Sequence, residues 1–276
     1  MLEPIISNNI VCHAVEAMIF ASITCSVLGV IIARMNISSI GFTMSHSAFA
    51  GAAAGMFLGI NPVISAIVAS VGVASSIGPI SQKAKMSADT TLGVLFAMSM
   101  AVAIFFISYM QYLGKGLSAG GLMFGDVVSL YREEIYMLGL LSLLTVLFII
   151  LFYKEILSLM FNMRIAEASG VRTKLVFYIL LFIIALSVSL NITIVGGLLI
   201  YIWLVVPAAI AYQFCYNVRD MFIVAPAVSL VVSIAGVYAG FEYSLPIGPL
   251  IGIIFTFLFA LAVIFSVKRR VTSNKS

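Results

Sequence analysis

One histidine lies inside a long apolar stretch of the sequence. His46 occurs in the run GFTMSHSAFAG, residues 41–51, where its neighbours are small, apolar or hydroxyl-bearing. An ionisable group in a membrane segment is costly unless it has a partner or lines a wet cavity, so it is a functional candidate by default. Its imidazole could bind a transition metal, with Thr43 and Ser45 close by. A buried histidine bonded to a hydroxyl or a backbone carbonyl is the alternative.

A second candidate group stands near the amino terminus. Cys12, His13 and Glu16 are three and four residues apart, so one face of a helix could present soft and hard metal ligands together. They fall at the outer end of the first apolar segment. A glutamate in the first turn of a helix also favours the helix dipole without any metal, so both readings stay open.

Patterns of catalytic chemistry are missing. The phosphate-binding pattern G-x-x-x-x-G-K-[ST] and the metalloprotease pattern H-E-x-x-H are absent, and His46 has no paired serine and aspartate nearby. Asp89 is predicted to cap a helix. The sequence therefore favours a transport subunit over an enzyme. A carrier that works alone usually places carboxylates or basic residues mid-membrane, and almost none occur besides His46, which favours an external motor.

The elements that hold these residues must be membrane helices. The chain has 276 residues, of which 63% are hydrophobic and 9% charged, whereas soluble domains have about 25% charged residues. We expect an all-α, multi-pass bundle in contact with lipid and no nucleic-acid partner. Cys12, Cys25 and Cys215 are odd in number and far apart, which argues against a disulfide framework.

The apolar segments set the number of crossings. Since a span needs about 20 mostly apolar residues, the chain predicts about nine spans in one domain, residues 1–276. These spans are expected at residues 14–33, 38–60, 62–81, 90–112, 135–153, 174–190, 193–213, 221–240 and 246–267.

The basic residues predict the orientation. With the amino terminus outside and the carboxyl terminus in the cytoplasm, only Lys115 and Arg132 of the 14 lysines and arginines fall outside. This is the asymmetry that the positive-inside rule demands, and shifting the count by one span would remove it.

Small residues on the second predicted span indicate close helix packing. Gly51, Gly55 and Gly59 recur every four residues, a spacing that lets a neighbouring membrane helix approach closely. On an ideal helix this stripe faces away from His46.

Two polar segments interrupt the spans. The outer one, residues 111–134, is rich in glycine and too short for a domain. The inner one, residues 153–174, predicts a short helix from Asn162 to Ala168, with Asn162 as its N-cap and Gly170 at its end. Such a surface helix could bind a cytoplasmic partner, or the segment could be an ordinary loop.

Six ordered blocks of the sequence resemble the ABC-3 family, the membrane permeases of zinc, manganese and iron ABC importers. They are GVIIARMNISSIGFTMSHSAFAG, SADTTLGVLFAMSMA, FGDVVSL, YKEILSLMFNMRIAEASGV, VGGLLIYIWLVVPAAIA and SLPIGPLIGIIFTFLFAL. The resemblance extends over nearly the whole chain.

The resemblance implies a type II ABC importer permease in the cytoplasmic membrane. It implies a homodimer with two cytoplasmic ATPase subunits that hydrolyse ATP, and an extracytoplasmic metal-binding protein that delivers the ion. No cofactor is expected in this chain, and the cargo is expected to be zinc, then manganese or iron. His46 matches the family's histidine for metal passage, with Ser45 beside it. The coupling helix that contacts the ATPase would include Arg164, Ala166, Glu167, Ala168 and Gly170.

Two positions depart from the family pattern. Phe42 stands where the family has an aspartate four residues before the histidine, and Ser244 replaces the aspartate of the D-L-P segment. Loss of the hard oxygen ligand disfavours manganese. The alternatives are the same fold carrying a metal chelate or an organic cofactor and, less favoured, a carrier or channel that needs no motor.

Overall fold

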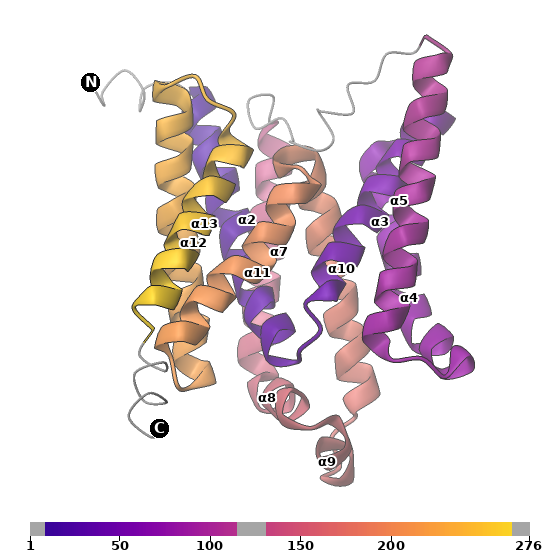
Figure 1. Cartoon of the computed structure of the whole chain (residues 1–276), viewed down its shortest axis with the longest axis vertical. Helices are drawn as coiled ribbons and strands as arrows, with labels where there is room; N and C mark the ends of the chain where they lie inside the picture. Colours follow the sequence, from indigo (N-terminus) through magenta and orange to yellow (C-terminus); the bar gives the residue numbers. More distant parts are fainter. Residues whose placement is uncertain (1–8, 115–130, 267–276) are drawn as a thin grey trace.

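The described part of the chain is entirely helical (Figure 1). The computed structural model describes residues 9–114 and 131–266. The helices are α2 (Asn9–Arg34), α3 (Ser39–Leu58), α4 (Pro62–Ala84), α5 (Ala88–Tyr112), α7 (Arg132–Leu151), α8 (Tyr153–Phe161), α9 (Met163–Ala168), α10 (Thr173–Val195), α11 (Gly197–Phe214), α12 (Val218–Glu242) and α13 (Ile247–Ile264). Most of the glycine-rich outer segment, including FGDVVSL, and the basic carboxyl terminus lie outside the described residues.

The long helices fall on the segments that the sequence predicts as spans. Seven helices of the described chain are long and apolar enough to cross a membrane, and Leu199–Phe214 is a shorter apolar helix. Helix α3, which carries His46, is rich in glycine, alanine and serine and is not among the seven. The all-helical, multi-pass prediction is confirmed. The count of nine spans and the orientation of the termini stay predictions.

Side-chain and backbone signals set several helix ends. The amide oxygen of Asn61 accepts hydrogen bonds from Val63 N at 2.9 Å and Ile64 N at 3.4 Å, and caps α4. Ser87 caps α5, since its hydroxyl oxygen accepts a bond from Thr90 N at 3.1 Å. The prediction that Asp89 caps this helix is wrong. Asp89 already lies within α5, and its carboxylate accepts a hydrogen bond from the Ser39 hydroxyl, joining the amino ends of α3 and α5.

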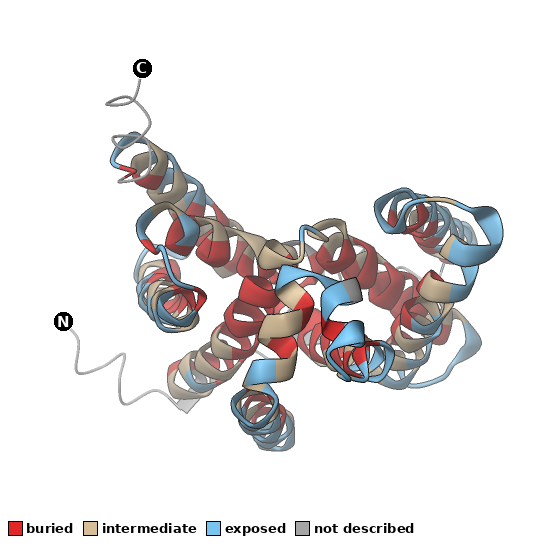
Figure 2. Ribbon diagram, turned by 90° about the horizontal axis from the view of Figure 1, so that it is seen from below, coloured by how far each residue is buried: buried red, intermediate tan, exposed pale blue. Residues whose placement is uncertain are grey.

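Helix α2 lies at the centre of the packing and contacts α7, α10, α11 and α12. Helix α3 packs against α4 and α5 and also touches α10 and α11. Buried residues face the interior, whereas exposed residues lie along the rim (Figure 2). Among the described glycines, the closest approach is at Gly29 on α2, where an added Cβ would come within 2.0 Å of the Leu204 carbonyl oxygen on α11.

The glycine stripe on α3 divides into two parts. A Cβ at Gly51 would lie 2.4 Å from the Ser65 carbonyl oxygen, and one at Gly55 would lie 2.4 Å from the Ser65 hydroxyl oxygen, so both sit directly against α4. Gly59 does not pack in this way, because a Cβ there would meet nothing within 4 Å. Instead it ends α3 with a φ of 72°, a left-handed conformation that glycine adopts without strain.

The short inner helix forms as predicted. Asn162 precedes α9, and its side-chain oxygen accepts a bond from Ile165 N at 3.3 Å. Gly170 follows the helix with a φ of 85°, and Val171 N donates to the Ala166 carbonyl at 3.1 Å. Helices α8 and α9 lie at the end of the molecule opposite the start of α7 (Figure 1).

One residue joins α10 to α11. Helix α10 ends at Val195, Gly196 has a φ of 82°, and α11 begins at Gly197. A residue with a side chain would be strained at this φ, so the sequence Gly196-Gly197 fixes where the two helices meet.

Candidate functional site

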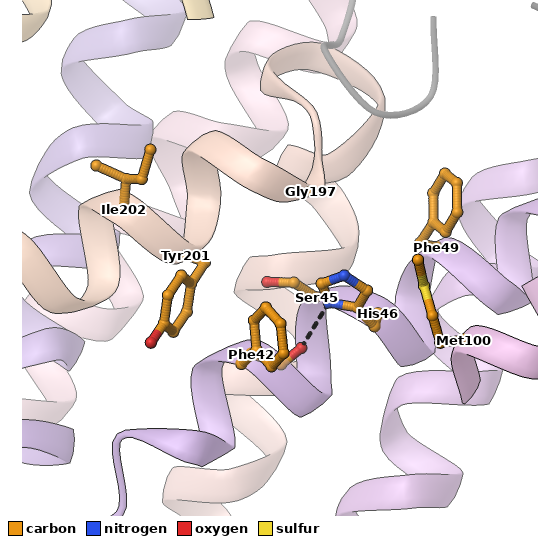
Figure 3. Close-up of a pocket in the computed structure, with 8 residues that line it drawn as sticks. All are labelled: Phe42, Ser45, His46, Phe49, Met100, Gly197, Tyr201 and Ile202. Atoms are coloured by element: carbon orange, nitrogen blue, oxygen red, sulfur yellow. Dashed lines mark hydrogen bonds between the residues drawn. The ribbon is translucent and has the colours of Figure 1, made fainter. Parts of the chain in front are cut away.

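His46 lines a cavity at the junction of three helices. The cavity has a volume of about 430 Å³, and its walls come from α3, α5 and the start of α11 (Figure 3). The lining residues are Phe42, Ser45, His46, Phe49, Met100, Gly197, Tyr201 and Ile202. In residues 9–114 and 131–266, the lining includes one imidazole, two hydroxyls and no carboxylate.

A backbone hydrogen bond orients the imidazole. His46 Nδ1 lies 3.0 Å from the carbonyl oxygen of Phe42, one turn earlier on α3. A carbonyl can only accept, so Nδ1 must carry the proton and donate it. In a neutral ring Nε2 is then unprotonated and keeps its lone pair. A metal-binding histidine commonly has this arrangement, in which one nitrogen donates to a carbonyl and the other binds the metal.

Phe42 places an aromatic ring beside His46. Its centroid lies 4.5 Å from that of His46, 4.3 Å from Phe96 and 5.1 Å from Tyr201. The ring of Phe96 also meets His46 edge to face at 4.8 Å. The rings of Phe42 and Phe96 therefore both contact the imidazole, so the site offers one nitrogen ligand in apolar surroundings.

Ser45 lines the same cavity and is buried from solvent. Its hydroxyl donates to the Gly41 carbonyl at 2.9 Å. The hydroxyl proton is therefore used within the helix, and only the oxygen lone pairs remain available to a cargo.

The residues Cys12, His13 and Glu16 line a separate cavity of about 250 Å³ between α2 and α7. Arg132 Nε donates a hydrogen bond to His13 Nε2 at 3.3 Å, which uses the lone pair that a metal would need. Among residues 9–114 and 131–266, no group of three or more His, Cys, Asp or Glu side chains could hold a metal ion. A metal site at these three residues stays a prediction, which the hydrogen bond from Arg132 disfavours.

The residues predicted to couple to an ATPase lie on or just after α9. Ala166 is buried, whereas Glu167, Ala168 and Gly170 are exposed. Arg164 belongs to the same helix. The exposed residues form a surface that another protein could contact.

Several cavity residues were not singled out in the sequence. Helical spacing places Phe42 and His46 together, but Met100, Gly197, Tyr201 and Ile202 come from helices distant in the sequence. The block VGGLLIYIWLVVPAAIA was a signal for three of them, since it contains Gly197, Tyr201 and Ile202.

A helical membrane protein with an imidazole in a cavity between three helices, and with few other ionisable groups, has the architecture of a transport protein. The sequence profile of the ABC 3 transport family matches residues 7–266. The chain therefore belongs to this family of ABC transporter permeases, which confirms the resemblance seen in the sequence.

Individual relatives agree with this assignment. The manganese transport system membrane protein MntC of Halalkalibacterium halodurans is 29% identical over 272 residues, which is 99% of this chain and 92% of MntC. The high-affinity zinc uptake system membrane protein ZnuB of Haemophilus influenzae is 27% identical and covers 89% of this chain and 93% of ZnuB. The solved structure of PsaBC from Streptococcus pneumoniae in complex with Fab has the same fold, with a TM-score of 0.86 at 22% identity over 100% of this chain and 98% of that chain.

Proposed function

We propose that this chain is the membrane-spanning subunit of an ATP-driven importer in the cytoplasmic membrane, and that its cargo is zinc, with manganese or iron as the next candidates. The observation that carries this proposal is the orientation of His46. Its Nδ1 is held by the Phe42 carbonyl, and Nε2 is left as a ligand at the cavity. An imidazole without a carboxylate suits zinc better than manganese.

A single ligand also suits transit. An ion held by many ligands would be trapped, whereas one imidazole per chain allows brief contact and release. In the proposed importer, two copies of this chain form the pore, and an extracytoplasmic protein delivers the metal. ATP binding and hydrolysis in two cytoplasmic subunits shift the equilibrium between outward-open and inward-open states.

Metal uptake by cells that lack this chain tests the proposal. We expect deletion to abolish high-affinity uptake of radioactive zinc, and a plasmid copy to restore it. Manganese and iron uptake, measured in the same cells, provide the comparison. Unchanged zinc uptake with loss of manganese uptake would contradict zinc as the cargo. Transport by the purified chain in liposomes without ATP would contradict the proposal that ATPase subunits drive the transport.

Glu167 offers a test of the coupling role of α9. Glu167 is exposed, and we propose that it contacts the ATPase subunit. Glu167→Lys is expected to lower transport by about tenfold, since a lost charged hydrogen bond costs about 1.5 kcal/mol. The measurement is ATP-dependent uptake by the copurified complex, together with its ATPase rate.

The matched control is Asp220→Lys, which reverses another exposed carboxylate, at the start of α12. It is expected to change transport less than twofold, because the proposal places no ATPase contact there. Equal effects of the two charge reversals would contradict the proposal that α9 has a specific role in coupling.

A further inference from the structure

The cavity at His46 is large for a bare ion. Its volume is about 430 Å³, and sites for small organic molecules commonly have about 300–1,000 Å³ with mostly apolar walls. Phe42, Phe49, Met100 and Ile202 supply such walls. A single metal ion would contact few of these groups.

The charges around the cavity also disfavour a bare dication. Among the residues that the structure describes, no carboxylate lines the cavity, and the position beside His46 that could supply one is Phe42. The nearby acid Asp89 accepts a hydrogen bond from Ser39, one turn before Phe42, and is not part of the lining. The described part of the wall therefore offers no negative charge to offset that of the metal.

The start of α11 also disfavours a bare dication in the cavity. Gly197 is both the first residue of α11 and part of the cavity wall (Figure 3). The amino end of a helix carries partial positive charge, which favours anionic or neutral groups over cations. The imidazole, apolar rings and helix terminus together suit a metal whose charge is already balanced by its own ligands.

We propose that the metal enters this cavity as a small complex with organic ligands, neutral or negatively charged overall, and that His46 Nε2 takes one coordination position. One metal–nitrogen bond forms as one bond from the metal to a water molecule breaks, and the water leaves without any change in oxidation state. The aromatic side chains contact the organic part of the complex. This inference rests on the proposed function, and it makes Phe42 a residue that determines specificity.

Transport of two labels distinguishes the complex from the free ion. The importer, purified with its partner subunits and reconstituted in liposomes, is given radioactive zinc as its bis(histidine) complex, with a different radioactive label on the histidine. A second series uses zinc with labelled citrate, whose complex is anionic. The reference is hydrated zinc held at the same free concentration by a chelator that does not cross membranes.

We expect zinc and one of the organic labels to enter together, in the ratio of the complex and only with ATP. Entry of zinc alone at the same rate from all sources would overturn the inference while leaving the proposed function intact. Entry of neither metal nor organic label would overturn both.

Phe42→Asp provides the second test, with Phe42→Asn as its matched control. Aspartate restores a negative charge beside His46, whereas asparagine has the same size and no charge. We expect Phe42→Asp to raise uptake of uncomplexed zinc by about tenfold or more, the scale of effects that groups around a metal site produce. Entry of the organic label should fall.

Phe42→Asn is expected to produce no such gain of free-zinc uptake. Equal behaviour of the two variants would overturn the role of charge at this position. If both variants fail to assemble, the two-label experiment on the unaltered importer decides the inference.

Discussion

His46→Asn is expected to lower metal uptake by about tenfold to a hundredfold, the range that perturbing a metal site commonly costs. The side-chain amide of asparagine can stand near the position of imidazole Nδ1 and donate to the Phe42 carbonyl in its place. The asparagine side chain has no atom that corresponds to Nε2. The substitution therefore removes the proposed metal ligand and keeps the hydrogen bond to the Phe42 carbonyl. The measurement is the initial rate of ATP-dependent zinc uptake.

His13→Ala is the matched control, because it removes the only other histidine of the chain. His13 Nε2 already accepts a bond from Arg132, so we expect uptake to change less than twofold. Dimer assembly, followed by size-exclusion chromatography, should be unchanged in both variants. Normal uptake by His46→Asn would show that the imidazole is structural and that its bond to Phe42 is its whole role.

Gly29→Ala is expected to destabilise the fold, because it places a methyl group where α2 packs against α11. The new Cβ would come within 2.0 Å of the Leu204 carbonyl oxygen and 2.8 Å of its carbonyl carbon. These are backbone atoms, which cannot rotate away as a side chain can, so α2 and α11 must separate. Overpacking of this kind commonly costs about 1–3 kcal/mol. The midpoint of thermal unfolding in detergent is the measurement.

Gly72→Ala is the control for this substitution. Gly72 lies within α4, and a Cβ there would meet nothing within 4 Å. Alanine favours a helix over glycine by about 0.5–1 kcal/mol, so the variant should be equally stable or slightly more stable. Equal losses of stability in the two variants would mean that the contact between Gly29 and Leu204 does not hold these helices together.

The sequence predicted the helices well, because the burial of apolar segments in lipid leaves few alternatives to a helix. It predicted α9 from Asn162 and Gly170, since capping and termination depend on local residues. The site was harder to predict. His46 stood out as an ionisable group, but Met100 and Tyr201 join it only through tertiary packing.

Contacts between helices account for what local spacing could not predict. Cys12, His13 and Glu16 do share one cavity, but Arg132 from α7 reaches His13, and nothing in the local spacing shows that contact. Asp89 looked like a cap because short acidic residues favour that position. Ser87 caps the helix instead, and Asp89 bonds to Ser39 on another helix. Gly29 was missed as a packing residue because a lone glycine carries no periodic signal.

The single-residue junction at Gly196 determines how a movement of α10 can be transmitted to the cavity wall. Helix α10 has 23 residues, which corresponds to about 34 Å at a rise of about 1.5 Å per residue. It contacts α9 near one end, and at the other it continues through Gly196 into the cavity wall at Gly197. Because only Gly196 separates the two helices, a displacement of α9 that moves α10 should also move the cavity wall at Gly197.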